Sequence, residues 1–251
     1  MKIITFGKGE RLRYCAELLG GETVLSGYSE LVILPIPTTV DGIHINATDT
    51  RLDELAGTVG EGSFVLGYGI PEPDVARLED AGATVCDALG DEIFLERNAE
   101  LTALGTVGVL LTSAGRGISE LSVGVVGYGR IGRHLIRILL FLGARVRVYT
   151  RKASTRLELC SLGIDASLSS DGDYAGLDYL INTAPDRILT VKETREVMAH
   201  GEIIDLASGV NFPGELSITK LGGIPGLMYP VSAGRIYAEA ALRYEGGGEE
   251  C

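Results

Sequence analysis

The chain of 251 residues is long enough to form one large domain or two modest domains, each with its own hydrophobic core. Its formal net charge of −12 at pH 7 argues against a broad nucleic-acid-binding surface, so no nucleic acid is expected as a partner. The four cysteines and three histidines are scattered, which predicts no metal site and is typical of a reducing cytoplasm. No apolar run is long enough to predict a membrane span.

Residues 2–90 alternate between short apolar runs and amphipathic segments. Strands are expected at 2–6, 30–34, 63–66 and 84–85, and helices at 11–19 and 73–81. Alternating strands and helices imply a parallel sheet that is covered on both faces. We assign residues 1–97 to an N-terminal flavodoxin-like or Rossmann-like domain that holds the substrate.

A long helix is expected over residues 98–116. It is apolar almost all round, which predicts that it is buried between layers or domains. Gly115 and Gly117 should end it. We therefore treat 98–117 as a helix that links two α/β domains, with a cleft lined by the loops that follow their strands.

The second half of the chain also alternates between strands and helices. After the apolar run that ends at Val126, helices are expected at 130–142, 155–162 and 191–199, and strands at 144–149, 178–182 and 202–206. We assign 118–231 to a nucleotide-binding Rossmann domain. Residues 222–226 are expected to form a loop and 232–244 a final helix, with Ser232 as its N-cap and a fraying tail to residue 251.

The turn Gly127-x-Gly129-x-x-Gly132 has the spacing of a dinucleotide-binding loop. Gly127 would let the chain turn off the strand, Gly129 would let a pyrophosphate approach the backbone, and Gly132 would let the helix pack closely on the strand. The free N–H groups and the positive dipole end at the helix start would attract phosphates. The alternative is a structural turn in an unrelated α/β protein. Because strands flank the turn on both sides, we predict a dinucleotide site formed by Gly127, Tyr128, Gly129, Arg130, Ile131 and Gly132.

The residues after the next strand indicate which dinucleotide is bound. An NAD site usually has an acidic residue about 20 residues past the first glycines. No carboxylate stands there in this chain; Thr150, Arg151, Lys152 and Ser154 do. Arg151 can bind a 2′-phosphate with two N–H groups, Lys152 adds charge, and the hydroxyls can donate hydrogen bonds. We therefore predict NADP rather than NAD, the alternative being a solvated basic turn.

Loops after other strands supply further candidates. We expect one such loop to line the nicotinamide ribose; it consists of Asn182, Thr183, Ala184 and Pro185. The candidate catalytic residues are Asp41, Asp205 and Ser208. Asp41 could act as a base, although Asp-Gly is also an ordinary turn, and Asp205 could orient ribose or substrate or cap a turn.

No histidine has an obvious carboxylate partner in the sequence. His134 lies within a predicted helix, and His44 and His200 lie in predicted loops. A general-base histidine is therefore not expected.

Segments along nearly the whole chain resemble the A component of dipicolinate synthase, which makes pyridine-2,6-dicarboxylate in sporulation. They are Ile33-Leu-Pro35, Thr38-Thr39, Gly42, Gly105-Thr106, Val126-Gly-x-Gly-Arg130, Ile181-Asn-Thr-x-Pro185, Asp205-Leu-Ala-Ser208, Gly223-Ile-Pro-Gly226 and Pro230 with Ser232-Ala-Gly234. The resemblance implies two Rossmann-like domains with parallel sheets, with the last helix packed back on the first domain. It also implies oxidation of a dihydrodipicolinate-type substrate with NADP, beside a flavoprotein-like B component. We further expect a cytoplasmic homo-oligomer such as a dimer.

A substrate with two carboxylates needs cations or convergent N–H donors. Arg11 and Arg235 are the candidate cations, although each could be a solvated surface residue. The full set of candidate substrate-binding residues is Arg11, Thr38, Thr39, Gly42, Ser208, Pro225, Ser232 and Arg235.

The chain also departs from that family. Gly9 stands where members carry an acidic residue, Val231 stands where they carry Lys, and Gly209 follows the Asp-Leu-Ala-Ser segment where they commonly have Arg. Two alternatives therefore stay open: a dehydrogenase of the same fold that acts on another small carboxylate, and a nucleotide-binding protein without catalysis. The D-2-hydroxyacid dehydrogenases resemble the second domain but need an Arg and a late catalytic His that this chain lacks.

Overall fold

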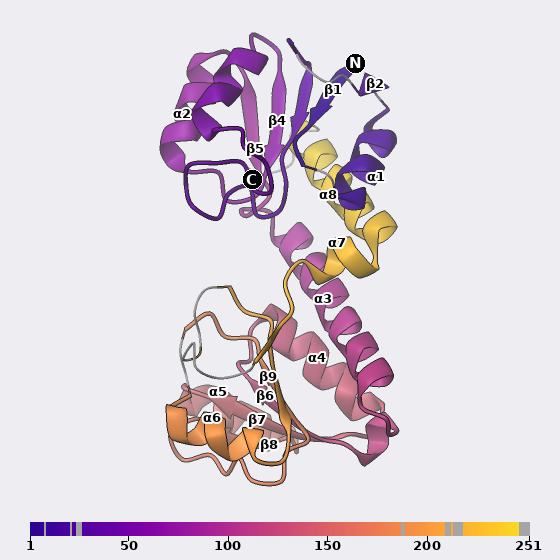
Figure 1. Cartoon of the computed structure of the whole chain (residues 1–251), viewed down its shortest axis with the longest axis vertical. Helices are drawn as coiled ribbons and strands as arrows, with labels where there is room; N and C mark the ends of the chain where they lie inside the picture. The colour runs from indigo at the N-terminus through magenta and orange to yellow at the C-terminus, as the bar shows by residue number, and fades with distance from the viewer. Residues whose placement is uncertain are drawn as a thin grey trace. The chain divides into compact units, whose positions relative to one another are not determined.

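The computed structural model describes residues 1–7, 9–20, 22–23, 27–186, 189–208, 212 and 218–245. These residues form an α/β fold with two parallel sheets, which confirms the fold class expected from the sequence (Figure 1). The chain divides into two compact units, Met1–Asn98 with Pro225–Cys251 (unit 1) and Ala99–Ile224 (unit 2). The domain boundaries assigned from the sequence at 97, 117 and 231 stay predictions, and the tail at 246–251 lies outside the described residues.

Unit 1 contains a five-stranded parallel sheet in the order β2-β1-β3-β4-β5. Its strands are β1 (Lys2–Thr5), β2 (Glu22–Thr23), β3 (Leu31–Ile33), β4 (Phe64–Gly67) and β5 (Thr84–Asp87). The helical segments of unit 1 are α1 (Glu10–Leu19), the 3-10 helix η1 (Leu52–Thr58), α2 (Glu72–Asp80), the start of α3 (Glu92–Ser113), most of α7 (Ile224–Met228) and α8 (Pro230–Glu245).

Both faces of this sheet are buried. Val32 and Val65 belong to a core cluster with Leu78 of α2. Their chain neighbours Ile33 and Leu66 are fully buried as well. Since successive side chains of a strand point to opposite faces, helices must cover the sheet from both sides, as the unbroken apolar runs of the sequence indicate.

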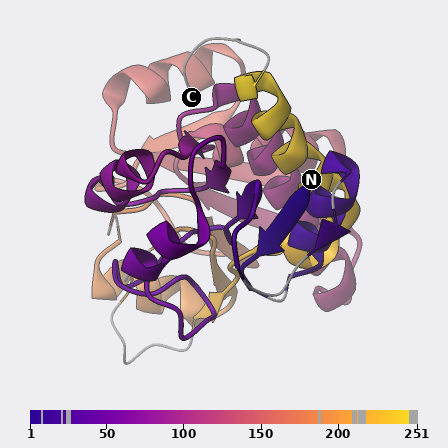
Figure 2. The same cartoon turned by 90° about the horizontal axis from the view of Figure 1, so that it is seen from above.

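Helix α8 lies beside α1, although the two are far apart in sequence (Figure 1, Figure 2). A Cβ atom at Gly234 would lie 2.7 Å from the carbonyl oxygen of Arg11 and 2.7 Å from Cβ of Tyr14, so only glycine permits this approach. The buried Tyr237 hydroxyl donates a hydrogen bond to the carbonyl oxygen of Leu34 (3.1 Å). The C-terminal helix therefore returns to the N-terminal unit, as expected.

Unit 2 contains a six-stranded parallel sheet in the order β11-β10-β9-β6-β7-β8. Its strands are β6 (Ser122–Val126), β7 (Arg145–Thr150), β8 (Asp165–Leu168), β9 (Tyr179–Asn182), β10 (Glu202–Asp205) and β11 (Thr219–Lys220). Besides most of α3, its helical segments are η2 (Ile118–Glu120), α4 (Arg130–Phe141), α5 (Ala153–Ser161) and α6 (Val191–Met198). The chain goes from β6 to β7 on one side and later returns to β9 on the other, so the strand order reverses at β6. Ligands of such sheets bind at the carboxyl ends of the strands near this reversal.

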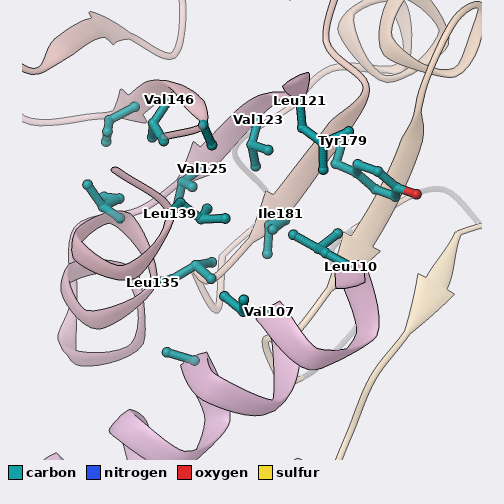
Figure 3. Packing of buried hydrophobic residues seen from close by; sticks show 14 of the residues in the cluster. Val107, Leu110, Leu121, Val123, Val125, Leu135, Leu139, Val146, Tyr179 and Ile181 are labelled. Carbon is teal, nitrogen blue, oxygen red and sulfur yellow. The ribbon is translucent and has the colours of Figure 1, made fainter. Parts of the chain in front are cut away.

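The core of unit 2 fixes α3 and α4 on one face of its sheet. Leu135 and Leu139 of α4 and Val107 of α3 point toward Val125 of β6 and Ile181 of β9 (Figure 3). All five are nearly or fully buried. Packing of α4 against β6 fixes the position of the turn that joins them.

Several helices begin earlier than the sequence predicts, and the starts of α3 and α8 have clear physical reasons. Helix α3 begins at Glu92 rather than at 98, because the Asp91 carboxylate accepts a hydrogen bond from the N–H of Phe94 (2.9 Å) and caps the helix. Helix α8 begins at Pro230, whose fixed φ suits a first helical turn, so the prediction of Ser232 as the N-cap is wrong.

Other expectations from the sequence also need correction. The expected loop at 222–226 contains the start of the short helix α7, and the short strands β2, β8 and β11 were not expected. Helix α3 is not buried all round, since Leu104 and Leu111 are 39% and 60% exposed.

The close approach of α8 to α1 makes a testable prediction. We expect Gly234→Ala to lower the free energy of unfolding by about 1–3 kcal/mol, because the added methyl group must displace backbone atoms of α1. Urea denaturation measures the loss. Gly57→Ala is the matched control in the same unit, since a Cβ there meets nothing within 4 Å; equal stability of the two variants would contradict the prediction.

Candidate functional site

The glycine turn after β6 is held by contacts that exclude larger residues. Gly127 has a φ of +99°, and a Cβ on it would lie 2.7 Å from Oγ1 of Thr183. A Cβ on Gly132 would lie 2.5 Å from the carbonyl oxygen of Gly127. The Thr183 hydroxyl donates to the carbonyl oxygen of Val126 (2.9 Å), so the loop after β9 supports the turn. Gly127 and Gly132 are therefore needed for the shape of the turn itself.

The start of α4 can receive an anion. Gly129 is the N-cap of the helix, no side chain caps it, and the first turn has no acidic residue. A Cβ on Gly129 would meet nothing within 4 Å, so open space lies beside this backbone. Uncapped N–H groups and the positive end of the helix dipole attract phosphate. The turn from Gly127 to Gly132, including Tyr128, Arg130 and Ile131, thus has the open backbone that the predicted dinucleotide site requires, and the binding role of these residues stays a prediction.

The ends of β9 and β10 are joined by a buried pair. The Asn182 amide donates to Oδ1 of Asp205 (2.8 Å) and to the carbonyl oxygen of Ala184 (3.1 Å). Oδ1 of Asp205 also accepts from the N–H of Ala207 (3.2 Å). Both side chains are 3% exposed. The structure thus places Asp205 in a turn-capping role, while Pro185 and Ser208 are exposed on the loops that follow.

The basic turn after β7 is more complex than the sequence suggests. The Arg151 guanidinium forms an ion pair with Asp186 (2.7 Å), and both side chains are exposed. The buried Thr150 uses its hydroxyl to accept the N–H of Lys152 (3.2 Å). Lys152 and Ser154 are exposed. Arg151 can face a ribose phosphate only in competition with a carboxylate, which the sequence does not reveal because Asp186 lies far from it in the chain.

Arg11 is a buried cation in unit 1. It is 7% exposed, and its Nε atom has no hydrogen-bond partner among the described residues. Its Nη2 lies 3.4 Å from Oδ1 of Asn98, and a Cβ on Gly226 would lie 3.3 Å from its Nε. Burial lowers the pKa of Arg11 to about 10. No carboxylate of the described residues forms an ion pair with it, so Arg11 is not the solvated surface residue that the sequence left open.

The loop after β3 contains a pair that the sequence analysis missed. Nδ1 of His44 lies 2.7 Å from Oδ2 of Asp41, so the expectation that this histidine lacks a carboxylate partner is wrong. The turn of Asp41 and Gly42 brings a side chain three residues away back onto the carboxylate; the spacing Asp-x-x-His in a turn is the signal that was available. Hydrogen bonds from the backbone N–H and the ring of His44 hold the pKa of Asp41 well below its usual range. Asp41 is therefore a poor general base.

The other predicted substrate residues are in varied environments. Thr38 is fully buried, and its hydroxyl accepts the N–H of Tyr68 (2.8 Å), which indicates a structural role. The Thr39 hydroxyl accepts the N–H of Gly42 (2.9 Å). The remaining three lie on α7 and α8: Pro225 is buried, whereas Ser232 and Arg235 are exposed.

Neither a metal centre nor a membrane-spanning helix is found in the described residues. In the part of the chain that the structure describes, no group of three His, Cys, Asp or Glu side chains could hold a metal ion. None of the helices in the described residues combines the length and apolar character needed to cross a membrane.

Comparisons with known proteins agree with the geometry of unit 2. Residues 108–211 match the family model of the NAD binding domain of D-isomer specific 2-hydroxyacid dehydrogenases. This match covers less than half of the chain. The sequence matches no curated protein.

Solved structures share the fold over almost the whole chain. The A component of dipicolinate synthase from Bacillus halodurans is 20% identical with a TM-score of 0.76, and the alignment covers 97% of each chain. The corresponding component from Bacillus subtilis has the same identity and TM-score over 98% of this chain and 96% of its own. The apo-structure of D-lactate dehydrogenase from Escherichia coli is 16% identical, with a TM-score of 0.59 over 99% of this chain and 98% of its own.

At these identities the structural likeness shows a common fold. The family match adds the type of the second domain and coincides with the glycine turn, the uncapped start of α4 and the reversal of strand order at β6. Unit 2 therefore carries an NAD-binding domain of the dehydrogenase type.

Proposed function

We propose that this protein is an NADP-dependent oxidoreductase that oxidises a small dicarboxylate of the dihydrodipicolinate type. The observation that carries the proposal is the glycine turn at the end of β6, which leaves open space at Gly129 and uncapped N–H groups on α4. The bound nicotinamide would supply the chemistry by accepting a hydride from the substrate. The protein's own residues hold the cofactor phosphates and the substrate carboxylates.

The buried Arg11 supports a carboxylate substrate. A buried cation without a counter-ion is costly, and a carboxylate ligand would remove much of that cost through charge-assisted hydrogen bonds. Arg235 follows Gly234, which lies against the carbonyl oxygen of Arg11, so both Arg side chains originate where α8 crosses α1. Arg235 is exposed and adds a second cation for a second carboxylate.

The proposal extends to further ligands and partners. The resemblance of the sequence to the A component of dipicolinate synthase favours a homo-oligomer, a flavoprotein-like partner and a sporulation role in the cytoplasm. Arg151, Lys152 and Ser154 favour a 2′-phosphate, since all three are exposed beside the end of β7. Asn182, Thr183, Ala184 and Pro185 would line the nicotinamide side of the same sheet edge.

A second candidate is a dehydrogenase of the same fold that acts on another small carboxylate. It is favoured by Val231 and Gly209, which stand where dipicolinate synthases of this type carry cations. Turnover of enzymatically generated dihydrodipicolinate, followed by the absorbance of NADPH, decides between the two. Turnover of only a different acid supports the second candidate, and tight NADPH binding without any turnover would support a non-catalytic nucleotide-binding protein.

The first prediction from the proposed function concerns the glycine turn. We expect Gly129→Ala to weaken the binding of NADPH at least about tenfold, which corresponds to about 1.4 kcal/mol, because its methyl group would occupy the space for the pyrophosphate. The free energy of unfolding should not change, since the protein itself has room for that methyl group. Calorimetric titration and urea denaturation measure the two effects, with Gly222→Ala in the same unit as a control that should change neither. Undiminished NADPH binding would contradict the site.

The second prediction concerns cofactor choice. Arg151→Ala should weaken NADPH much more than NADH, whereas Asp186→Asn should strengthen NADPH, because it releases Arg151 from its ion pair. Affinities for both cofactors are measured by fluorescence titration. Lys192→Ala, which removes a cation from α6 of the same unit, is the control for net charge. Equal losses of NADPH and NADH in Arg151→Ala would refute the phosphate-binding role.

The third prediction concerns Arg11. Arg11→Met should leave the free energy of unfolding unchanged or raise it by up to about 4 kcal/mol, because it removes a buried unpaired charge. The same change should weaken the binding of pyridine-2,6-dicarboxylate by about 10- to 100-fold, since a charged hydrogen bond contributes about 1.5–3 kcal/mol. Arg13→Met alters an exposed Arg of the same helix that pairs with Glu10, and it should leave binding unchanged. Loss of stability without loss of binding would assign Arg11 a purely structural role.

A further inference from the structure

In the loop after β3 of unit 1, the Asp41 carboxylate orients the ring of His44. A carboxylate only accepts hydrogen bonds, so the 2.7 Å contact requires the proton on Nδ1 of His44. In the neutral ring this leaves the lone pair on Nε2, on the opposite side of the ring. A carboxylate that fixes the tautomer and direction of an imidazole is the arrangement used for general acid–base catalysis.

Asp41 is fixed independently of the histidine ring. Its Oδ1 accepts the backbone N–H groups of Ile43 and His44, both at 2.8 Å, and the hydroxyl of Thr39 at 3.2 Å. Its Oδ2 is left to face the ring. The carboxylate therefore holds the imidazole from a position that the loop has already determined.

The backbone around His44 is anchored as well. The N–H of Ile45 donates to the carbonyl oxygen of Thr50 (2.9 Å), the N–H of Leu52 donates to that of Ile43 (2.9 Å), and Ile45 is fully buried. Arg51 pairs with His44 through an isolated antiparallel β-bridge, and its guanidinium forms an ion pair with Asp53 (2.9 Å) instead of facing the ring. Among the described contacts of the loop, the charge that touches the ring is thus that of Asp41.

This loop reaches the part of unit 1 that contains Arg11. The N–H of Asn46 donates to the carbonyl oxygen of Thr38 (2.7 Å), and a Cβ on Gly7 would lie 4.0 Å from the carbonyl oxygen of Asn46 and 3.5 Å from Leu12 of α1. Gly7 follows β1, and the loop of His44 follows the neighbouring strand β3. His44 therefore lies in the loop after β3, and Arg11 lies in the first turn of α1, which follows the neighbouring strand β1.

We propose that His44 is the acid–base residue of the dehydrogenase reaction and that Asp41 is its positioning residue. This inference rests on the proposed function. When the substrate is oxidised, it gives up a hydride from carbon to NADP⁺ and a proton from the adjacent atom to Nε2 of His44, and a double bond forms between the two atoms. In the reverse direction the same proton returns to the substrate.

Kinetics of a matched set of variants test the assignment. We expect His44→Ala to lower kcat by about 10²–10⁴-fold with little change in KM, and added imidazole to restore part of kcat by occupying the vacated place. Asp41→Asn should lower kcat less and should gain nothing from imidazole. His200→Ala, in the turn after α6, is the control that should change neither value. Turnover by the wild type with undiminished kcat in His44→Ala would overturn this inference and leave the proposed function standing.

A second readout does not need turnover. The chain has three histidines, so isotope labelling of their rings gives three sets of signals that variants can assign. We expect His44 to show the Nδ1–H form in the wild type and to lose that preference in Asp41→Asn. Pyridine-2,6-dicarboxylate should shift the Nε2 signal of His44 and leave that of His200 in place. Calorimetric binding of the dicarboxylate with an unmoved His44 signal would overturn the inference alone, whereas neither binding nor turnover with any small acid would overturn the proposed function as well.

Discussion

The cofactor end of unit 2 depends on one close approach between backbone atoms. The carbonyl oxygen of Gly127 occupies the space that a side chain at Gly132 would fill, so the first turn of α4 lies directly against the end of β6. Leu135 and Leu139 then pack α4 on the sheet. This combination fixes the direction of the helix, and its uncapped N–H groups consequently face the sheet edge where Gly129 leaves space. A larger residue at 132 would therefore act by changing the direction of the helix, and not by removing a group that touches a phosphate.

In unit 1 a glycine also permits a close approach between backbone atoms, here between two helices. Gly234 lets α8 approach the backbone of α1, and this contact attaches the C-terminal residues to the N-terminal sheet. It also places Gly226 against the guanidinium of Arg11, which seals a cation from water. The burial of Arg11 is thus a consequence of how the two ends of the chain pack, not of the apolar character of α1 itself.

The sequence predicts features that depend on neighbours in the chain. The turn from Gly127 to Gly132, with strands before and after it, is such a feature, and so are the two parallel sheets. Helix ends were less predictable, because the start of α3 depends on a single cap at Asp91 that precedes the apolar pattern. The pairing of Arg151 with Asp186 could not be foreseen, since it joins loops that only the order of β7, β6 and β9 brings to one edge.

Unit 1 stabilises its two candidate charged groups differently. One is the Asp41 carboxylate beside His44, and the other is the buried guanidinium of Arg11. Asp41 is exposed, and its pKa is lowered because the N–H groups of its own loop stabilise the carboxylate. Arg11 is buried, and its pKa is lowered to about 10 because burial disfavours the cation. The first charge is satisfied by the protein and can direct a neighbouring imidazole without binding anything else. The second has no carboxylate partner among the described residues, and its Nε has no hydrogen-bond acceptor there, so a bound anion would stabilise it. A dehydrogenase of small acids needs a cation that binds the substrate carboxylate and an oriented proton acceptor. In unit 1, Arg11 of α1 is suited to the first role and His44 of the loop after β3 to the second.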